Sequence, residues 1–361
     1  MEVASQITSQ HSTSFQPLFA RFAYLILCFR GYFSGIMDDT LVITLFLNFI
    51  IVCAIDFKHI YKDFFIFATL SLLTVYNRDI LALIDILAII YVLRNASISF
   101  FIRTNAIILF IYFCIWGMLV ATEMLHDKIM VMPKGIAHCY GYENSNQLGM
   151  LGFQIISAIF LLSKKKWKIL VFISIPLINE LFFSWSIART PWIGGYVMML
   201  IMFLSAVKLL PSFMKYFVAI LPLIIFGCLI YFAKHLSMYP ELDIIFTTRF
   251  SNYARLLTAM SPINWIIGFP MGQNIIIDSS YFMILCSGGI GCVILFWGAY
   301  FKAILTRWNF LYPYLPFIIA MLANGVGENS FSSANGLSLI FWFLIFCHEK
   351  PKHRHKLNNS K

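Results

Sequence analysis

Three arginines lie in polar segments of an otherwise apolar chain, where a guanidinium could bind an anion. Arg189 lies in segment 186–192, and Arg249 and Arg255 lie in segment 248–257. A guanidinium held in one place can donate two parallel hydrogen bonds to a phosphate. These residues therefore predict a phosphate-binding site. The alternative for Arg189 is a position at the membrane edge, where its side chain reaches toward water or pairs with an acid such as Glu180.

Two carboxylates and one histidine could accept a proton beside these arginines. Asp278 directly precedes an apolar stretch, Glu328 lies in the polar turn 324–330, and His138 lies in the polar segment 137–149. A carboxylate or an imidazole within hydrogen-bonding reach of a hydroxyl can act as a general base. Two alternatives stay open: Asp278 also suits the N-cap of the helix that follows it, and a histidine in a loop is often structural.

Aromatic and amide side chains near these groups are the types that bind sugar rings. Aromatic faces stack on the apolar faces of a sugar, and amides form hydrogen bonds with its hydroxyls. The candidates are Tyr140, Tyr142, Asn144, Asn146, Tyr253 and Tyr281. Asn144 or Asn146 could equally cap the helix that begins after them.

Two local patterns predict how the arginines are held. Thr190 as N-cap and Pro191 at the first helical position would place Arg189 in a tight turn between two helices. Positions 249, 253 and 256 fall on one helical face, which predicts an amphipathic helix lying at the membrane surface. A turn with Gly268 and Gly272 follows this helix.

The composition predicts that membrane-spanning helices carry these residues. Of 361 residues, 60% are hydrophobic and only 12% are charged, and the mean hydropathy is +0.83. A soluble domain carries about 25% charged residues, so this composition argues against a cytosolic enzyme, a disordered chain and a disulfide scaffold. Since one span needs about 20 apolar residues, we predict an all-α bundle of about twelve spans: 17–36, 40–55, 63–77, 80–94, 104–122, 147–163, 167–187, 191–207, 214–233, 279–301, 312–324 and 333–348.

The distribution of positive charge predicts the orientation of this single polytopic domain, residues 1–361. Cytoplasmic loops collect Lys and Arg, so the basic run 164–168 and the basic tail 349–361 are expected inside, with both termini. Eighteen of the 26 lysines and arginines then lie on or near the inner side. The two long loops, 123–146 and the larger 234–278, lie outside, the latter before the tenth span. The positive charge is thus explained by anionic membrane lipids, and nucleic acid is not expected as a partner.

With these residues in hand, the chain resembles the bacterial oligosaccharide repeat-unit polymerases (Wzy-type) and, more distantly, the O-antigen ligases. The resemblance covers roughly residues 135–335. It rests on four segments in order: 138–146, 186–190, 249–253 with the later glycine turn, and 278–290. In the ligases the last segment commonly begins with His. Asp278 stands there in this chain, which favours a polymerase.

The resemblance implies an inverting, metal-independent glycosyltransferase without a cofactor in the bacterial cytoplasmic membrane. It would join undecaprenyl-diphosphate-linked oligosaccharides at the outer face, for O-antigen, capsule or exopolysaccharide. Arg189, Arg249 and Arg255 would bind the donor diphosphate, and Asp278, His138 or Glu328 would accept the proton. A chain-length regulator would be a possible protein partner.

Three alternatives remain at this stage. A ligase would transfer finished glycan to an acceptor. A lipid-linked oligosaccharide flippase or other transporter would favour charged or discontinuous helices near the membrane centre and often an internal repeat. The predicted spans contain only Asp85 and Glu180 as acids, and no repeat is visible. A membrane scaffold would give no account of the three outer arginines.

Overall fold

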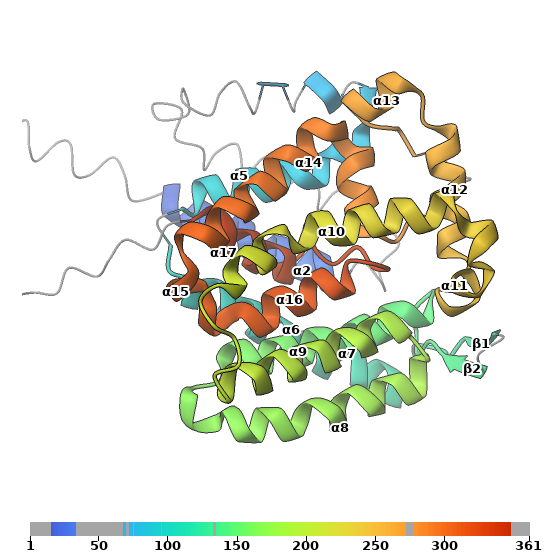
Figure 1. Ribbon diagram of the computed structural model, residues 1–361. Helices are drawn as coiled ribbons and strands as arrows, with labels where there is room; N and C mark the ends of the chain where they lie inside the picture. Colours follow the sequence, from blue (N-terminus) through green and yellow to red (C-terminus); the bar gives the residue numbers. More distant parts are fainter. Residues whose placement is uncertain are drawn as a thin grey trace, which may run out of the picture.

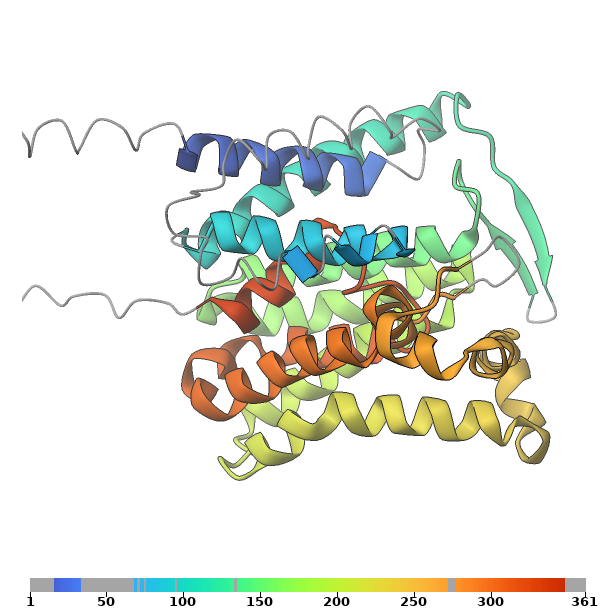
Figure 2. The same ribbon diagram turned by 90° about the horizontal axis from the view of Figure 1, so that it is seen from above.

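The protein is a bundle of helices that run side by side, with a small β-hairpin and two short helices gathered at one end (Figures 1 and 2). The computed structural model describes residues 16–33, 68–69, 72–74, 76–94, 96–132, 135–271 and 277–347. We call the end that carries the hairpin the hairpin end.

Five described helices are long and apolar enough to cross a membrane, by length and composition. They are α6 (Ile98–Ala121), α7 (Ser145–Leu162), α8 (Lys168–Ser186), α10 (Met214–Lys234) and α14 (Ser280–Thr306). The remaining α-helices of the bundle are α2 (Gln16–Phe33), α5 (Leu81–Val92), α9 (Arg189–Ala206), α15 (Trp308–Leu311), α16 (Leu315–Asn324) and α17 (Gly336–Phe346). The prediction of a helical membrane protein is confirmed at this level.

The count of twelve spans is not established by these helices. Span 40–55 and most of span 63–77 lie outside the described residues. The segments predicted as 312–324 and 333–348 form α16 and α17, of 10 and 11 residues. Helices of that length fall short of the roughly 20 residues that one crossing needs.

The two long loops are structured. Loop 123–146 contains the antiparallel hairpin of β1 (Ile129–Met132) and β2 (Gly135–His138), in which Ile129 pairs with His138. Loop 234–278 contains α11 (Pro240–Ile245), α12 (Arg249–Ala259) and α13 (Pro262–Ile267). The hairpin is the only sheet among the described residues, so it modifies the all-α prediction locally.

Glycines allow the central helices to pack closely. A Cβ at Gly152 of α7 would lie 2.6 Å from the ring of Phe182 on α8, and one at Gly195 of α9 would lie 2.6 Å from Asn179. The Asn179 side chain also donates to the carbonyl of Trp192 at 2.8 Å. Small residues and interhelical hydrogen bonds are the usual means of packing helices in a membrane. They fix α7, α8 and α9 as one unit.

Helix α14 is broken at Gly288 and Gly289, where the backbone leaves the helical conformation. Gly289 has φ +65°, and a Cβ there would lie 2.2 Å from the carbonyl oxygen of Ile266 in α13. The Cys286 carbonyl, freed by the break, accepts from the backbone N–H of Phe269 at 2.7 Å and from the Asn77 amide at 2.6 Å. The segment around α13 therefore packs into the break and satisfies the exposed backbone.

Candidate functional site

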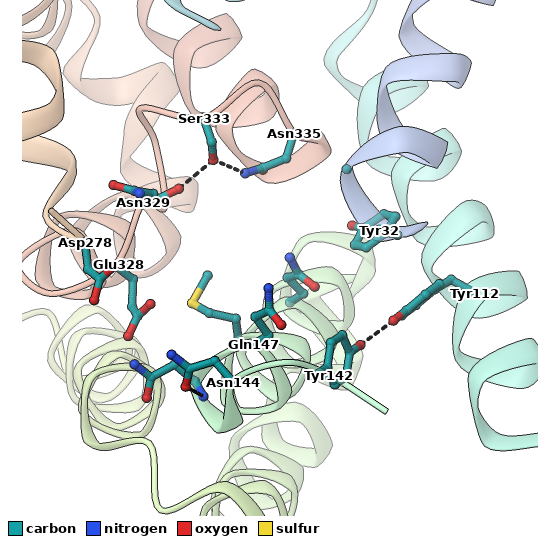
Figure 3. Close-up of a pocket in the computed structure, with 14 residues that line it drawn as sticks. Tyr32, Tyr112, Tyr142, Asn144, Gln147, Asp278, Glu328, Asn329, Ser333 and Asn335 are labelled. Atoms are coloured by element: carbon teal, nitrogen blue, oxygen red, sulfur yellow. Dashed lines mark hydrogen bonds between the residues drawn. The ribbon is translucent and has the colours of Figure 1, made fainter. Parts of the chain in front are cut away.

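A polar pocket of about 340 Å³ lies at the hairpin end, among α2, α6, α7 and the turn between α16 and α17 (Figure 3). This volume is at the small end of the range for small-molecule sites. The lining is mainly amide, phenol and carboxyl side chains: Gly31, Tyr32, Tyr112, Tyr142, Asn144, Asn146, Gln147, Met150, Gln154, Asp278, Glu328, Asn329, Ser333 and Asn335.

One wall of the pocket is built on a buried arginine. Arg249 Nη2 donates to Glu328 Oε1 at 2.7 Å, and Arg249 Nε lies 3.6 Å from Asp278 Oδ2. Its Nη1 donates to the hydroxyl of Thr190 at 3.2 Å. Three sequence candidates from separate parts of the chain, Arg249, Asp278 and Glu328, thus form one cluster. The guanidinium is engaged by these partners and is not among the lining residues.

Arg249 is held by the buried face of α12. Arg249, Phe250, Tyr253 and Leu256 are the buried residues of this helix, which confirms the predicted face of positions 249, 253 and 256. The Tyr253 hydroxyl donates to the carbonyl of Val326 at 3.0 Å, and burial raises its pKa. Tyr253 therefore anchors α12 to the turn that carries Glu328 and does not line the pocket.

Asp278 lies just before α14 and is not its N-cap, and its carboxylate lies near Arg249. The prediction of Asp278 as N-cap is wrong: Ser279 occupies that position, and α14 begins at Ser280. The backbone N–H of Ser280 donates to Gly325 O at 2.9 Å, and its hydroxyl donates to Glu328 O at 2.8 Å. The start of α14 is thus tied to the turn after α16, and the Asp278 side chain is left 36% exposed.

A second wall is the first half of α7. Asn144 is the N-cap and its side chain accepts from the Asn146 N–H at 3.0 Å, which confirms one of the two predicted caps. Asn146, Gln147 and Gln154 continue this wall along one helical face. Their side-chain amides have no hydrogen-bond partner among the described residues and line the pocket.

Phenols form the third wall. The hydroxyl groups of Tyr112 on α6 and Tyr142 are hydrogen-bonded to each other (Figure 3). The Tyr32 hydroxyl on α2 donates to Asn105 Oδ1 at 2.7 Å. These bonds fix the rings of residues far apart in the sequence. Tyr281 of α14, which the sequence suggested as a sugar-binding residue, is fully buried in the core. Its hydroxyl donates to Leu322 O at 3.1 Å.

His138 lies on the hairpin, outside the pocket lining, and pairs with Asp127. Its Nδ1 is hydrogen-bonded to Asp127 Oδ2, and its ring stacks on Tyr140 at 5.5 Å between centroids. Asp127 Oδ1 also accepts from the backbone N–H groups of Cys139 and Tyr140. Partial burial raises the pKa of Asp127, but these hydrogen bonds to the charged form outweigh it, so the net pKa is lowered.

The other two arginines differ in their distance from the cluster. Arg189 is the first residue of α9, next to Thr190, and its Nη1 donates to the carbonyl of Ile245 at 2.9 Å. Arg255 is exposed on the outward side of α12. Arg189 is therefore joined to the cluster through its chain neighbour Thr190, which accepts from Arg249, whereas Arg255 makes no hydrogen bond or ion pair with it among the described residues.

The turn before α9 also differs from the prediction. Ala188, not Thr190, is the N-cap, and Pro191 lies two residues inside the helix. Thr190 is therefore free to accept from Arg249. Glu180 does not pair with Arg189: its Oε1 accepts from Trp192 Nε1 at 2.8 Å and from the Tyr196 hydroxyl at 2.6 Å.

Nine of the fourteen lining residues were not among the residues predicted from the sequence: Gly31, Tyr32, Tyr112, Gln147, Met150, Gln154, Asn329, Ser333 and Asn335. One pattern pointed to two of them: Gln147 and Gln154 are seven residues apart in an apolar span, so they share a helical face. Polar residues in a membrane helix usually face the interior of the bundle. The tyrosines of α2 and α6 gave no comparable pattern.

Within the described residues, no group of three His, Cys, Asp or Glu side chains could hold a metal ion. Comparisons with protein-family models, curated proteins and solved structures found no match to this chain.

Proposed function

We propose that this protein is a membrane glycosyltransferase that polymerises oligosaccharide repeat units linked to undecaprenyl diphosphate. The reaction would take place at the outer face of the bacterial cytoplasmic membrane, and the hairpin end would be the outer end. The observation that carries the proposal is the pocket itself: two carboxylates stand on one side of a hollow lined by amides and phenols. Amides and phenols suit sugar hydroxyls, and a carboxylate suits the activation of one of them.

The proposed step is a displacement at the anomeric carbon of the donor sugar. A hydroxyl of the acceptor sugar attacks this carbon and forms the new glycosidic bond. The bond from the anomeric carbon to the diphosphate oxygen breaks, and the diphosphate leaves with the electron pair. The hydroxyl proton passes to a pocket carboxylate and then to water. Attack from the face opposite the leaving group inverts the anomeric configuration.

Asp278 is the better candidate for the base. Its carboxylate is 36% exposed and 3.6 Å from Arg249, whereas Glu328 is 11% exposed and receives a 2.7 Å hydrogen bond from the same guanidinium. Glu328 is therefore committed to holding Arg249, while Asp278 remains accessible to a substrate hydroxyl. Arg189, whose neighbour Thr190 accepts from Arg249, would interact with the charge that develops on the leaving diphosphate.

The proposal is tested in the organism that carries this chain by deleting the gene and restoring it with variants. We expect the deletion strain to carry single repeat units on its surface, and the Asp278→Asn and Arg189→Ala variants to leave the same product. Membrane insertion of each variant is checked by its abundance in the membrane fraction. Asn309→Ala, an exposed amide at the opposite end of the bundle, is the control and should restore long chains.

Two results would overturn the assignment. Long glycan that accumulates unattached in the deletion strain would identify a ligase. Long, attached glycan in both the Asp278 and the Arg189 variants would remove the pocket from the reaction.

A further inference from the structure

The pocket combines side-chain amides that have no hydrogen-bond partner in the described part of the chain with two carboxylates that share one arginine. The amides of Asn146, Gln147 and Gln154 have no partner among the described residues, and each can both donate and accept. Asp278 and Glu328 supply the only charges of the described lining, in which no Lys, Arg or His occurs. Figure 3 shows Asp278 and Glu328 on one side of the pocket and Gln147 between them and the tyrosines Tyr142 and Tyr112.

Arg249 does not reverse the net negative charge of Asp278 and Glu328. Arg249 contributes one positive charge against two negative ones, and it lies behind them, outside the lining. A ligand in the pocket meets the carboxylate oxygens first. A second anion placed there would be repelled in a partly enclosed space, where the effective dielectric constant is below that of water.

The amide wall favours a ligand rich in hydroxyl or acetamido groups. Gln147 and Gln154 are seven residues apart and so present their amides at two depths along α7. Met150 lies between them on the same face and supplies an apolar contact. This alternation of polar and apolar contacts matches a pyranose ring, which carries hydroxyls at its rim and C–H groups on its faces.

We propose that this pocket selects an uncharged sugar and rejects sugars that carry a carboxylate, sulfate or phosphate. This inference rests on the proposed function, since it identifies the class of sugar unit that the polymerisation site accepts. It assigns the discrimination to Asp278 and Glu328 and the positive recognition to Gln147 and Gln154. The diphosphate of the donor would accordingly stay outside the pocket, with Arg189 as its proposed partner.

The test is direct binding to the full chain in lipid nanodiscs, measured by saturation-transfer NMR at pH 7. The probes are methyl glucoside, methyl N-acetylglucosaminide and methyl glucuronide, which differ mainly in one substituent. We expect at least one neutral glycoside to bind and the glucuronide to bind at least about tenfold more weakly. Gln147→Ala and Gln154→Ala should each weaken neutral binding several-fold, whereas Asn309→Ala should leave it unchanged.

Asp278→Asn tests whether the carboxylate causes the weaker binding of the glucuronide, because it removes one negative charge and keeps the size of the side chain. We expect it to narrow the difference between the glucuronide and its neutral counterpart at least threefold. Equal binding of the glucuronide to the unmodified chain, unchanged neutral binding in both glutamine variants, or no binding of any probe would overturn the inference. Neutral binding without any change in cellular glycan on deletion would instead overturn the proposed function and leave the pocket's selectivity in place.

Discussion

Arg249 and Glu328 are 79 residues apart in the chain, yet they form a buried ion pair with 2.7 Å between Nη2 and Oε1. The pair joins α12, from the largest loop, to the turn after α16. Because Asp278 also lies against the same guanidinium, one side chain fixes both carboxylates of the pocket.

Breaking this pair should affect both stability and glycan length. Arg249→Ala leaves Glu328 buried without its cation, and we expect it to lower the free energy of unfolding by about 3–5 kcal/mol. Thermal unfolding in detergent, followed by tryptophan fluorescence, measures this loss. The double variant Arg249→Met, Glu328→Met should recover much of the stability but remain unable to make long glycan. Long glycan from the double variant would show that the pair is only structural.

Substitutions at Asp278 and His138, two of the three candidate bases, should differ in their effect on the reaction rate. We expect Asp278→Asn to lower the rate of polymerisation of purified lipid-linked repeat units by about 10²–10⁴-fold, the usual contribution of a general base. His138→Asn should cause a loss of less than about tenfold, since His138 is outside the pocket lining. A larger loss for His138 than for Asp278 would transfer the role of base to the hairpin.

The break in α14 should tolerate no side chain at Gly289. Gly289→Ala adds a Cβ 2.2 Å from the carbonyl oxygen of Ile266 at φ +65°, and we expect it to cost at least about 2 kcal/mol of unfolding free energy. Gly291→Ala, two residues later, meets no atom within 4 Å and should change stability by less than about 1 kcal/mol. Thermal unfolding distinguishes the two. Equal behaviour of both variants would mean that α13 does not pack into the break.

The hairpin should lose stability in acid through Asp127. Its pKa is lowered in the folded protein, so its stabilising contribution is fully present above the ordinary value of about 3.9 and is lost as the pH falls through the folded pKa. We expect the amides of Cys139 and Tyr140 to exchange hydrogen faster than neighbouring amides below about pH 4. Asp127→Asn should remove this pH dependence, whereas Glu241→Gln, at an exposed acid, should retain it. An unchanged exchange profile in Asp127→Asn would contradict this account.

Local patterns in the sequence were sufficient to predict several elements. The apolar stretches correspond to the five long helices, and the spacing of positions 249, 253 and 256 predicted the buried face of α12. The cap at Asn144 also followed from its position before an apolar run. These features depend on neighbours within one or two helical turns.

Contacts between distant residues could not be predicted in the same way. Asp278 and Thr190 each precede an apolar stretch and each suit an N-cap, but tertiary partners decided otherwise. Arg249 lies close to both side chains, and the turn 325–328 holds the start of α14. Tyr32 and Tyr112 became pocket residues only because α2 packs against α6 and α6 packs against α7. Nothing in their own segments distinguishes them from core tyrosines.

The break at Gly288 and Gly289 divides α14 into a short segment and a long segment. The short segment runs from Ser280 to Ser287. It is hydrogen-bonded to Phe269, just after α13, through the Cys286 carbonyl, and to the turn 325–328 through Ser280. The long segment packs against α10, where the Tyr300 hydroxyl donates to the carbonyl of Val218, and against α17, where Phe296 contacts Trp342. Asp278 lies just before the short segment and 3.6 Å from Arg249 of α12, so it is connected to the elements at the hairpin end. The carboxylate wall of the pocket is thus joined to the loop elements, whereas its amide and phenol walls belong mainly to α2, α6 and α7, so a shift between these two parts of the protein would change the width of the pocket.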